Sequence, residues 1–217
     1  MGSMPGCSCA TDYDAIFDDR MARRELDAYR RRGPQGSTRR LIGMLLAEGV
    51  EGSRLIDIGG GVGVIGHELL AAGAASVLDV DASRGYLAAA RAEAERRGLE
   101  ARAEYRYGDF VEISAEIEPA DLVTLDRVLC CYADWEALVA RSTERARRIY
   151  AIVYPMDRWW VRAAARLGNA GLALFRQSFR FHVHPNRAVE RRIRAAGFQL
   201  VHRHRGAIWQ VLAYRRA

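Results

Sequence analysis

The segment that most constrains the fold is a short apolar strand that runs directly into a cluster of glycines. Residues 54–58 read Arg-Leu-Ile-Asp-Ile, and four of the next five residues are glycine. A helical pattern follows over residues 63–72. Glycines let the backbone turn tightly after a strand, and the start of the next helix offers unpaired N–H groups to a ligand. This order of elements indicates an α/β sheet with a ligand site at the carboxyl ends of its strands.

The rest of the chain continues the alternation of strands and helices. The further predicted elements are strands at 76–80, 104–107, 121–125 and 149–154, and helices over 83–97, 135–147, 158–175 and 186–196. This rhythm predicts a parallel sheet that is covered by helices on both faces. Two more apolar runs, 198–204 and 208–214, are joined by Arg205-Gly206 and predict an antiparallel hairpin.

We therefore expect one α/β domain with a Rossmann-like, seven-stranded, mostly parallel sheet, an antiparallel last strand and helices on both faces. The 217 residues, half of them hydrophobic, suffice for one core. Ser37 or Thr38 is expected to cap the second of two N-terminal helices. The expected parts are, in order, an N-terminal helical cap, a cofactor-binding core, a lid insert after the fifth strand, and a final helix with the hairpin: residues 1–50, 51–154, 155–185 and 186–217.

Charge is distributed unevenly along the chain. Residues 1–140 hold 16 arginines and 24 acidic residues, whereas residues 141–217 hold 17 arginines and 3 acidic residues. A basic half can serve nucleic acid, a membrane surface or an anionic substrate, although a solvated arginine-rich surface is the simplest interpretation. The chain contains no lysine, which excludes a P-loop lysine, a Schiff-base lysine and any catalytic pair that uses lysine.

The glycine loop by itself matches two classes of cofactor. Residues 61–66 fit the dinucleotide pattern G-x-G-x-x-G, which would indicate NAD or FAD. Asp57 ahead of the loop favours a cofactor with a cationic amino group, because a carboxylate would repel a pyrophosphate. The absence of lysine also removes the Tyr-x-x-x-Lys pair of short-chain dehydrogenases.

Residues 54–154 resemble the core of class I S-adenosylmethionine-dependent methyltransferases, and the resemblance extends in topology to the C-terminal hairpin. Residues 127–132 and 181–185 are similar to stretches of an uncharacterised bacterial methyltransferase group, which is distantly like the magnesium-protoporphyrin O-methyltransferases. The resemblance implies S-adenosyl-L-methionine as cofactor and S-adenosyl-L-homocysteine as product. The expected activity is transfer of the methyl group to a small-molecule acceptor by in-line displacement.

The same resemblance implies which residues bind the cofactor. Asp57 and the glycines of the loop would line its methionine part, and Asp81 would hold the ribose hydroxyls, with Asp79 as a near competitor. Asp109 would bind the adenine amino group, and Phe110 would pack on the adenine ring. The full expected set is Asp57, Gly59, Gly60, Gly61, Gly63, Asp81, Ala82, Gly108, Asp109, Phe110, Asp126 and Arg127.

Candidates for binding the acceptor lie mainly in the expected lid and at its borders. A general base is needed only for a protonated, weakly nucleophilic acceptor. His182 and His184 are the best candidates, and a pair of structural histidines is the alternative. Arginines mixed with aromatic residues over 158–180 indicate an anionic acceptor that is partly aromatic or apolar. The expected acceptor-binding residues are Tyr13, Tyr132, Tyr154, Trp159 and Trp160.

Other functions stay open at this level. The basic half keeps an RNA methyltransferase possible, and the core would also suit a non-catalytic module that binds S-adenosylmethionine or a nucleotide. Cys7, Cys9, Cys130 and Cys131 lack zinc-ribbon spacing, so no metal is expected, although the two pairs could converge on one ion. We expect a cytoplasmic protein without a membrane span or signal peptide, with nucleic acid not the expected partner. The oligomeric state stays open.

Overall fold

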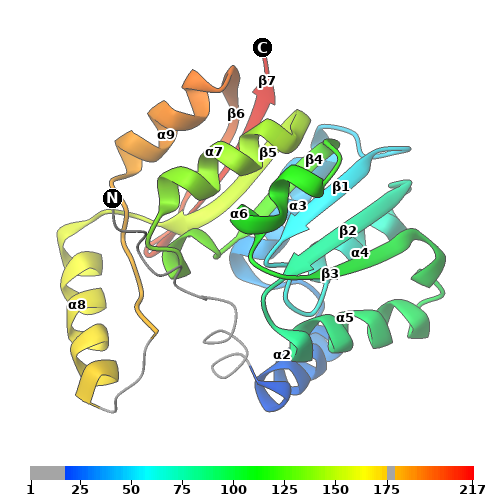
Figure 1. Ribbon diagram of the computed structural model, residues 1–217, viewed down its shortest axis with the longest axis horizontal. Helices are drawn as coiled ribbons and strands as arrows, with labels where there is room; N and C mark the ends of the chain where they lie inside the picture. Colours follow the sequence, from blue (N-terminus) through cyan, green and yellow to red (C-terminus); the bar gives the residue numbers. More distant parts are fainter. Residues whose placement is uncertain (1–17, 175–178) are drawn as a thin grey trace, which may run out of the picture.

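The computed structural model describes residues 18–174 and 179–217, and a seven-stranded sheet forms its centre (Figure 1). The strand order across the sheet is β3-β2-β1-β4-β5-β7-β6. Six strands run in one direction and β7 runs against them. This confirms the mostly parallel sheet with an antiparallel last strand. The strands are β1 (Arg54–Ile58), β2 (Ser76–Asp81), β3 (Ala103–Tyr107), β4 (Ala120–Asp126), β5 (Ala146–Pro155), β6 (Phe198–Arg205) and β7 (Trp209–Arg216).

Helices cover both faces of the sheet, as expected (Figure 1). The α-helices are α2 (Asp19–Arg32), α3 (Gly36–Ala47), α4 (Val64–Ala71), α5 (Arg84–Arg96), α6 (Phe110–Ile113), α7 (Trp135–Arg145), α8 (Trp159–Leu174) and α9 (Asn186–Ala195). One apolar core forms between the sheet and α3, α4 and α5, and another between the sheet and α6, α7 and α9. The central strands β4 and β5 are buried on both faces, which explains why their sequences are continuously apolar.

Side-chain caps fix where several helices begin. Asp18 accepts a hydrogen bond from the Met21 N–H at 2.8 Å, and Ser83 accepts one from the Tyr86 N–H at 3.2 Å. The cap expected at Ser37 or Thr38 is wrong, because α3 already begins at Gly36 and its N-cap residue makes no side-chain cap bond. Thr38 lies inside the first turn of α3, where its hydroxyl donates a hydrogen bond to the Asp126 carboxylate.

The C-terminal hairpin is held to the N-terminal part of the chain. Glu48, which follows α3, accepts hydrogen bonds from His202 Nε2 at 2.8 Å and from Arg215 Nη2 at 2.6 Å. Its side chain is 5% exposed, and these contacts lower the pKa of its carboxyl against the effect of burial. The first described helices and the last two strands therefore form one structural unit.

Helix α8 is the expected insert after β5, and it stands at the carboxyl side of the sheet (Figure 1). Only Val161 of this helix is fully buried. Asn169 joins the helix to the following extended segment, because its amide donates to the Phe181 carbonyl and accepts from the Phe181 N–H, both at 2.8 Å. Among the described residues, no helix combines the length and apolarity that crossing a membrane requires.

Candidate functional site

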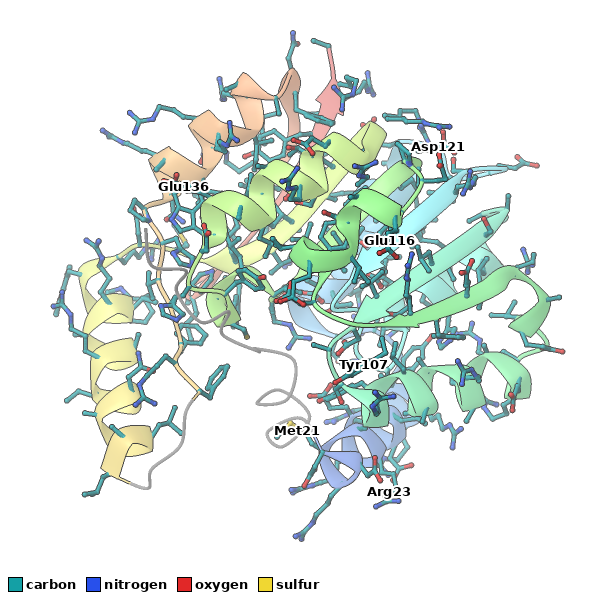
Figure 2. All side chains as sticks on the ribbon, in the orientation of Figure 1. Met21, Arg23, Tyr107, Glu116, Asp121 and Glu136 are labelled. Atoms are coloured by element: carbon teal, nitrogen blue, oxygen red, sulfur yellow. The ribbon has the colours of Figure 1, made fainter. Side chains whose placement is uncertain are left out.

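A cavity of about 260 Å³ lies where the glycine loop meets the carboxyl ends of β2, β3 and β4. Tyr107 marks this edge of the sheet in Figure 2, and Asp121 marks the opposite edge. Loops at the carboxyl ends of parallel strands are the usual place for a ligand. The lining includes Glu25, Thr38, Gly59, Gly60, Gly61, Asp81, Ala82, Tyr86, Gly108, Asp109, Phe110, Asp126, Arg127, Val128, Cys131 and Tyr132.

Backbone geometry explains why the loop after β1 is built from glycine. Gly61 has a φ of 61°, in the left-handed region that side chains disfavour. Gly60 lies outside that region, but a Cβ atom there would be 2.6 Å from the Asp79 carboxylate. The loop therefore passes so closely over β2 that a larger residue at position 60 would displace its neighbour.

Asp81 ties the loop to the end of β2. Its Oδ2 accepts from the Gly61 N–H at 3.1 Å, and its Oδ1 accepts from the Ser83 N–H at 2.8 Å. A carboxylate oxygen can accept more than one hydrogen bond, and Asp81 also lines the cavity. Asp79 lies beneath Gly60, is 2% exposed and does not line the cavity. The structure thus brings Asp81, and not its near competitor Asp79, to the site.

Asp57 and Asp79 form a pair of buried carboxyls under the loop. They are direct neighbours in the register of β1 and β2. Asp57 Oδ1 accepts from the Thr124 hydroxyl at 2.6 Å, whereas its Oδ2 and both Asp79 oxygens have no hydrogen-bond partner among the described residues. Burial raises the pKa of Asp57 to about 7 and holds the pKa of Asp79 well above its usual range. Asp57 therefore supports the loop from below instead of lining the cavity.

The end of β3 supplies an acidic and an aromatic side chain. Asp109 caps α6 by accepting from the Val111 N–H at 2.8 Å, and both its oxygens lie 2.7 Å from the Tyr132 hydroxyl. Phe110 is buried and lines the same side of the cavity. The structure thus places Tyr132, which we expected at the acceptor, beside the acidic residue expected to bind adenine.

The end of β4 supplies a carboxylate and a cation. Asp126 accepts hydrogen bonds from the Thr38 hydroxyl and from Arg127 Nε, the latter at 3.2 Å. Arg127 has a φ of 63°, and it is the one non-glycine residue with a positive φ in the described part of the chain. Strained backbone of this kind tends to persist where the surroundings impose it, as they do at binding sites. Arg127 is also the one cationic side chain among the described lining residues.

Several lining residues were not expected from the sequence, among them three that come from helices α2, α3 and α5. Glu25 and Thr38 come from α2 and α3, and Tyr86 comes from the first turn of α5. Tyr86 is buried against Leu26 and Tyr29 of α2, and this packing sets the position of α2 over the loop. Ser83 caps α5 and Tyr86 lies three residues later, so the position of Tyr86 in the first turn of this helix could have been read from the sequence. No local pattern marks Glu25, because its position depends on how α2 packs.

The expected aromatic wall is not brought to the cavity. Tyr154 is fully buried in the core that the sheet forms with α6, α7 and α9, and it does not line the cavity. Trp159 is 80% exposed, Trp160 is half-buried, and neither lines the cavity. The structure therefore does not bring these three residues to the cavity, and their role in binding the acceptor stays a prediction. Tyr13 lies outside the described residues.

The two candidate histidines lie behind the turn that follows β4. His184 Nε2 is 2.9 Å from the Leu129 carbonyl and 3.0 Å from the Tyr132 carbonyl, so this nitrogen carries the proton and donates to both. The His182 ring stacks on His184 with the ring centres 5.7 Å apart, and burial lowers the pKa of both residues. Neither lines the cavity. The structure favours the structural alternative for this pair over a catalytic base.

Comparison with known proteins identifies the core. Residues 55–148 match a family model described as a methyltransferase domain. No curated protein sequence matches the chain. The residues that this model covers include β1 to β4, the glycine loop and all the strand-end carboxylates of the site.

Solved structures share the fold over most of the chain. Magnesium protoporphyrin IX methyltransferase from Synechocystis PCC 6803, with S-adenosylhomocysteine bound, is 15% identical, with a TM-score of 0.66 over 100% of this chain and 90% of its own. An O-methyltransferase family protein from Burkholderia thailandensis is 17% identical, with a TM-score of 0.71 over 94% of this chain and 63% of its own. An O-methyltransferase family 2 protein from Planctomyces limnophilus, in complex with apigenin, is 21% identical, with a TM-score of 0.61 over 77% of this chain and 52% of its own.

At these identities the likeness establishes the fold, and the domain match establishes the class of chemistry. The close passage of Gly60 over Asp79 keeps the loop free of side chains at that position. Residues 55–148 therefore form a methyltransferase domain, and the chain has the fold of S-adenosylmethionine-dependent methyltransferases.

Proposed function

We propose that this methyltransferase acts on a small acceptor that is anionic and partly aromatic or apolar, and that the acceptor carries its own nucleophile. The observation that carries the proposal is the lining near the end of β4. There the cation of Arg127 stands among apolar or aromatic neighbours, which include Val128, Leu138 and Tyr132. An apolar wall beside the cavity's one described cation suits a ligand that has an apolar body and a negative charge.

The residues of the site divide into roles. We assign the methionine part of the cofactor to the glycine loop with Asp57 beneath it, the ribose to Asp81, and the adenine to Asp109 and Phe110. Asp81 is held at the cavity by the Gly61 and Ser83 N–H groups, and Asp109 is fixed by Tyr132 and by the start of α6. Bound there, S-adenosylmethionine supplies a methyl group already activated on a sulfonium. The protein then has to orient the acceptor and exclude water.

The described side chains offer no evident general base at the cavity, which supports an acceptor that needs no deprotonation. No histidine lines the cavity in the described part of the chain, and His184 donates its Nε2 proton to backbone carbonyls. Asp126 already accepts from Thr38 and Arg127. A carboxylate acceptor is already ionised at neutral pH, whereas a phenol would ionise only if Arg127 lowered its pKa; in either case Arg127 would hold the anion.

The solved neighbours give independent support for a small acceptor. The Synechocystis neighbour is a methyltransferase of magnesium protoporphyrin IX, and the Planctomyces neighbour holds apigenin. Both compounds are small molecules with an aromatic framework. The chemistry proposed from Arg127 and its apolar surroundings is compatible with acceptors of that kind.

RNA is the alternative acceptor that the basic C-terminal part favours, but several of those arginines serve the fold. Arg148 donates to the Glu48 and Gly49 carbonyls at 2.8 and 2.7 Å. Arg216 Nε donates to the Ala146 carbonyl at 3.1 Å. Arginines used in this way stabilise the ends of core elements and do not present a continuous surface to phosphate.

Two measurements test the proposal. Calorimetric titration is expected to show binding of S-adenosylmethionine and S-adenosylhomocysteine but not NAD. Transfer of labelled methyl from the cofactor is then compared across aromatic carboxylates, phenols, amines and total RNA. Turnover of a carboxylate or phenol, with a KM that rises in Arg127→Gln but not in the exposed control Arg141→Gln, supports the assignment. Turnover confined to RNA, or to amines with no effect of Arg127→Gln, contradicts it.

A further inference from the structure

Cys130 and Cys131 form a close pair of thiols at the cavity. They lie in the short 3₁₀ turn Leu129–Cys131 that follows β4. Their sulfur atoms are 3.8 Å apart, and both approach the Arg127 carbonyl oxygen, at 3.1 Å for Cys130 and 3.8 Å for Cys131. Cys131 lines the cavity, whereas Cys130 is 2% exposed behind it.

We propose that Cys130 and Cys131 are a two-thiol binding site, at the wall of the cofactor cavity, for a thiophilic species that accepts two sulfur ligands, such as a trivalent arsenical. The site is separate from the assignment of the methyl acceptor, and it predicts a ligand class for residues that the methyl-transfer chemistry does not use.

Geometry favours a bridging atom over a direct disulfide. Adjacent Cα atoms across a trans peptide lie about 3.8 Å apart, whereas disulfides usually need about 4.4–6.8 Å between Cα atoms. No cis peptide bond occurs among the described residues, so Cys130 and Cys131 have the shorter spacing. Two sulfurs bound to one tetrahedral atom through bonds of about 2.3 Å lie about 3.8 Å from each other, and two sulfurs on a pyramidal trivalent arsenic lie somewhat closer because its bond angles are narrower. The sulfur separation of 3.8 Å in this turn is therefore a small side-chain rotation away from the spacing that a shared arsenic atom needs.

The number of ligands selects the chemistry of the bound species. A structural zinc ion takes four protein ligands. No group of three or more His, Cys, Asp or Glu side chains is placed to hold a metal ion within the described ranges. A trivalent arsenical with one organic substituent completes its coordination with two sulfurs, so it fits a site that offers two thiols.

The electrostatic surroundings make Cys131 the attacking group. A hydrogen bond from Cys130 lowers the pKa of the Cys131 thiol against the effect of burial, and the Arg127 charge acts in the same direction. The same hydrogen bond, together with burial, raises the pKa of Cys130. The thiolate is the reactive form of cysteine. Cys131, which faces the cavity, therefore reacts first, and Cys130 closes the ring behind it.

The reaction with the probe phenylarsine oxide balances without an oxidant. Two As–S bonds replace the As=O bond, and the oxygen leaves as one water molecule with the two thiol protons. Arsenic stays trivalent and the phenyl group remains on it. Because Cys131 and Tyr132 line one wall with Asp109 fixed behind Tyr132, the phenyl group would project into the space expected for the cofactor.

The test uses the full chain with Cys7→Ser and Cys9→Ser, so that Cys130 and Cys131 are its two thiols. Phenylarsine oxide is expected to add one phenylarsenic group per chain, to remove both titratable thiols, and to give an adduct that survives excess monothiol but is released by 2,3-dimercaptopropanol. Saturating S-adenosylhomocysteine is expected to slow labelling at least tenfold. Cys131→Ser is expected to abolish the monothiol-resistant adduct.

Three results would overturn the proposal. These are failure to form a monothiol-resistant adduct in a chain that still binds S-adenosylhomocysteine, persistence of that adduct in Cys131→Ser, and rapid closure of a 130–131 disulfide with diamide. Cys130→Ser is informative only if it binds S-adenosylhomocysteine normally. Labelling of the Cys7→Ser, Cys9→Ser chain by phenylarsine oxide, and the slowing of that labelling by S-adenosylhomocysteine, test the proposal without the Cys130→Ser variant.

Discussion

The close passage of the glycine loop over β2 gives a double-mutant test of the site's architecture. In Gly60→Ala the added Cβ would lie 2.6 Å from the nearest Asp79 carboxylate oxygen, whereas ordinary contacts begin near 3.4 Å. The carboxyl, or the loop, must therefore move by about 0.8 Å, and overpacking a buried site by one methyl group costs about 1–3 kcal/mol. We expect Gly60→Ala to lower the free energy of unfolding by that amount and to weaken binding of S-adenosylhomocysteine.

Removing the obstructing carboxyl should remove the penalty. Asp79→Ala deletes a buried group whose two oxygens have no hydrogen-bond partner in the described structure, so this change alone should cost little or stabilise the protein. In that background Gly60→Ala should be neutral or stabilise by up to about 1 kcal/mol, because alanine restricts the unfolded chain and Gly60 lies outside the left-handed region. The expected coupling between the two positions is therefore at least about 1 kcal/mol.

Urea unfolding of the four variants, with calorimetric titration of S-adenosylhomocysteine, measures the cycle. Gly61→Ala is the matched control. Its φ of 61° makes the cost a backbone cost of about 1–2 kcal/mol, and Tyr86 at 3.5 Å is an ordinary contact. Asp79→Ala should leave that cost unchanged. If Gly60→Ala and Asp79→Ala are additive within about 0.5 kcal/mol, the loop does not pass over β2 as described.

Three further outcomes follow from the site. Asp81→Asn should weaken S-adenosylhomocysteine binding at least about tenfold by titration calorimetry, because a charged acceptor is worth about 1.5–3 kcal/mol, and unchanged affinity would remove Asp81 from the ribose site. The pKa of Asp57 is raised from 3.8 to about 7, so its contribution to stability is present at low pH and is lost as the pH rises from 3.8 to about 7. In Asp57→Asn the free energy of unfolding should therefore fall less steeply over this pH range than in the parent chain. Equal slopes in the two proteins would argue against a buried neutral carboxyl. His184→Ala should lower the free energy of unfolding by about 1–3 kcal/mol by leaving the Leu129 and Tyr132 carbonyls without their donor, while the pH profile of kcat stays unchanged; a shifted profile would restore the histidine as a base.

The parts of the site that follow strands could be predicted, because they depend on local order. Each strand end is marked by a change from apolar residues to a carboxylate or glycine, so Asp81, Asp109 and Asp126 could be placed at one edge from the alternation alone. The same local signals placed the hairpin. The seven-stranded, mostly parallel sheet with an antiparallel last strand then followed from the resemblance to a known family, and the structure confirms it.

The parts that depend on packing between distant segments could not be predicted. Tyr154 was expected at the site because it follows an apolar strand, but a strand buried on both faces has no alternation that tells one face from the other. Glu25 reaches the cavity only because α2 packs on Tyr86. The sequence left His184 open as either a base or a structural histidine, because its contacts with two carbonyls depend on how distant segments pack.

The link between Glu48 and the C-terminal hairpin has a consequence for how the chain folds. Glu48 meets His202 and Arg215 across more than 150 residues of sequence, and β7 supplies the only described neighbour of β5 on that side of the sheet. During synthesis every residue of the cavity leaves the ribosome before β7 exists, so the nascent core presents the unpaired edge of its most buried strand. Pairing at such long sequence separation is slow. The hairpin should therefore dock late, and until it does the core is open to strand pairing with other chains.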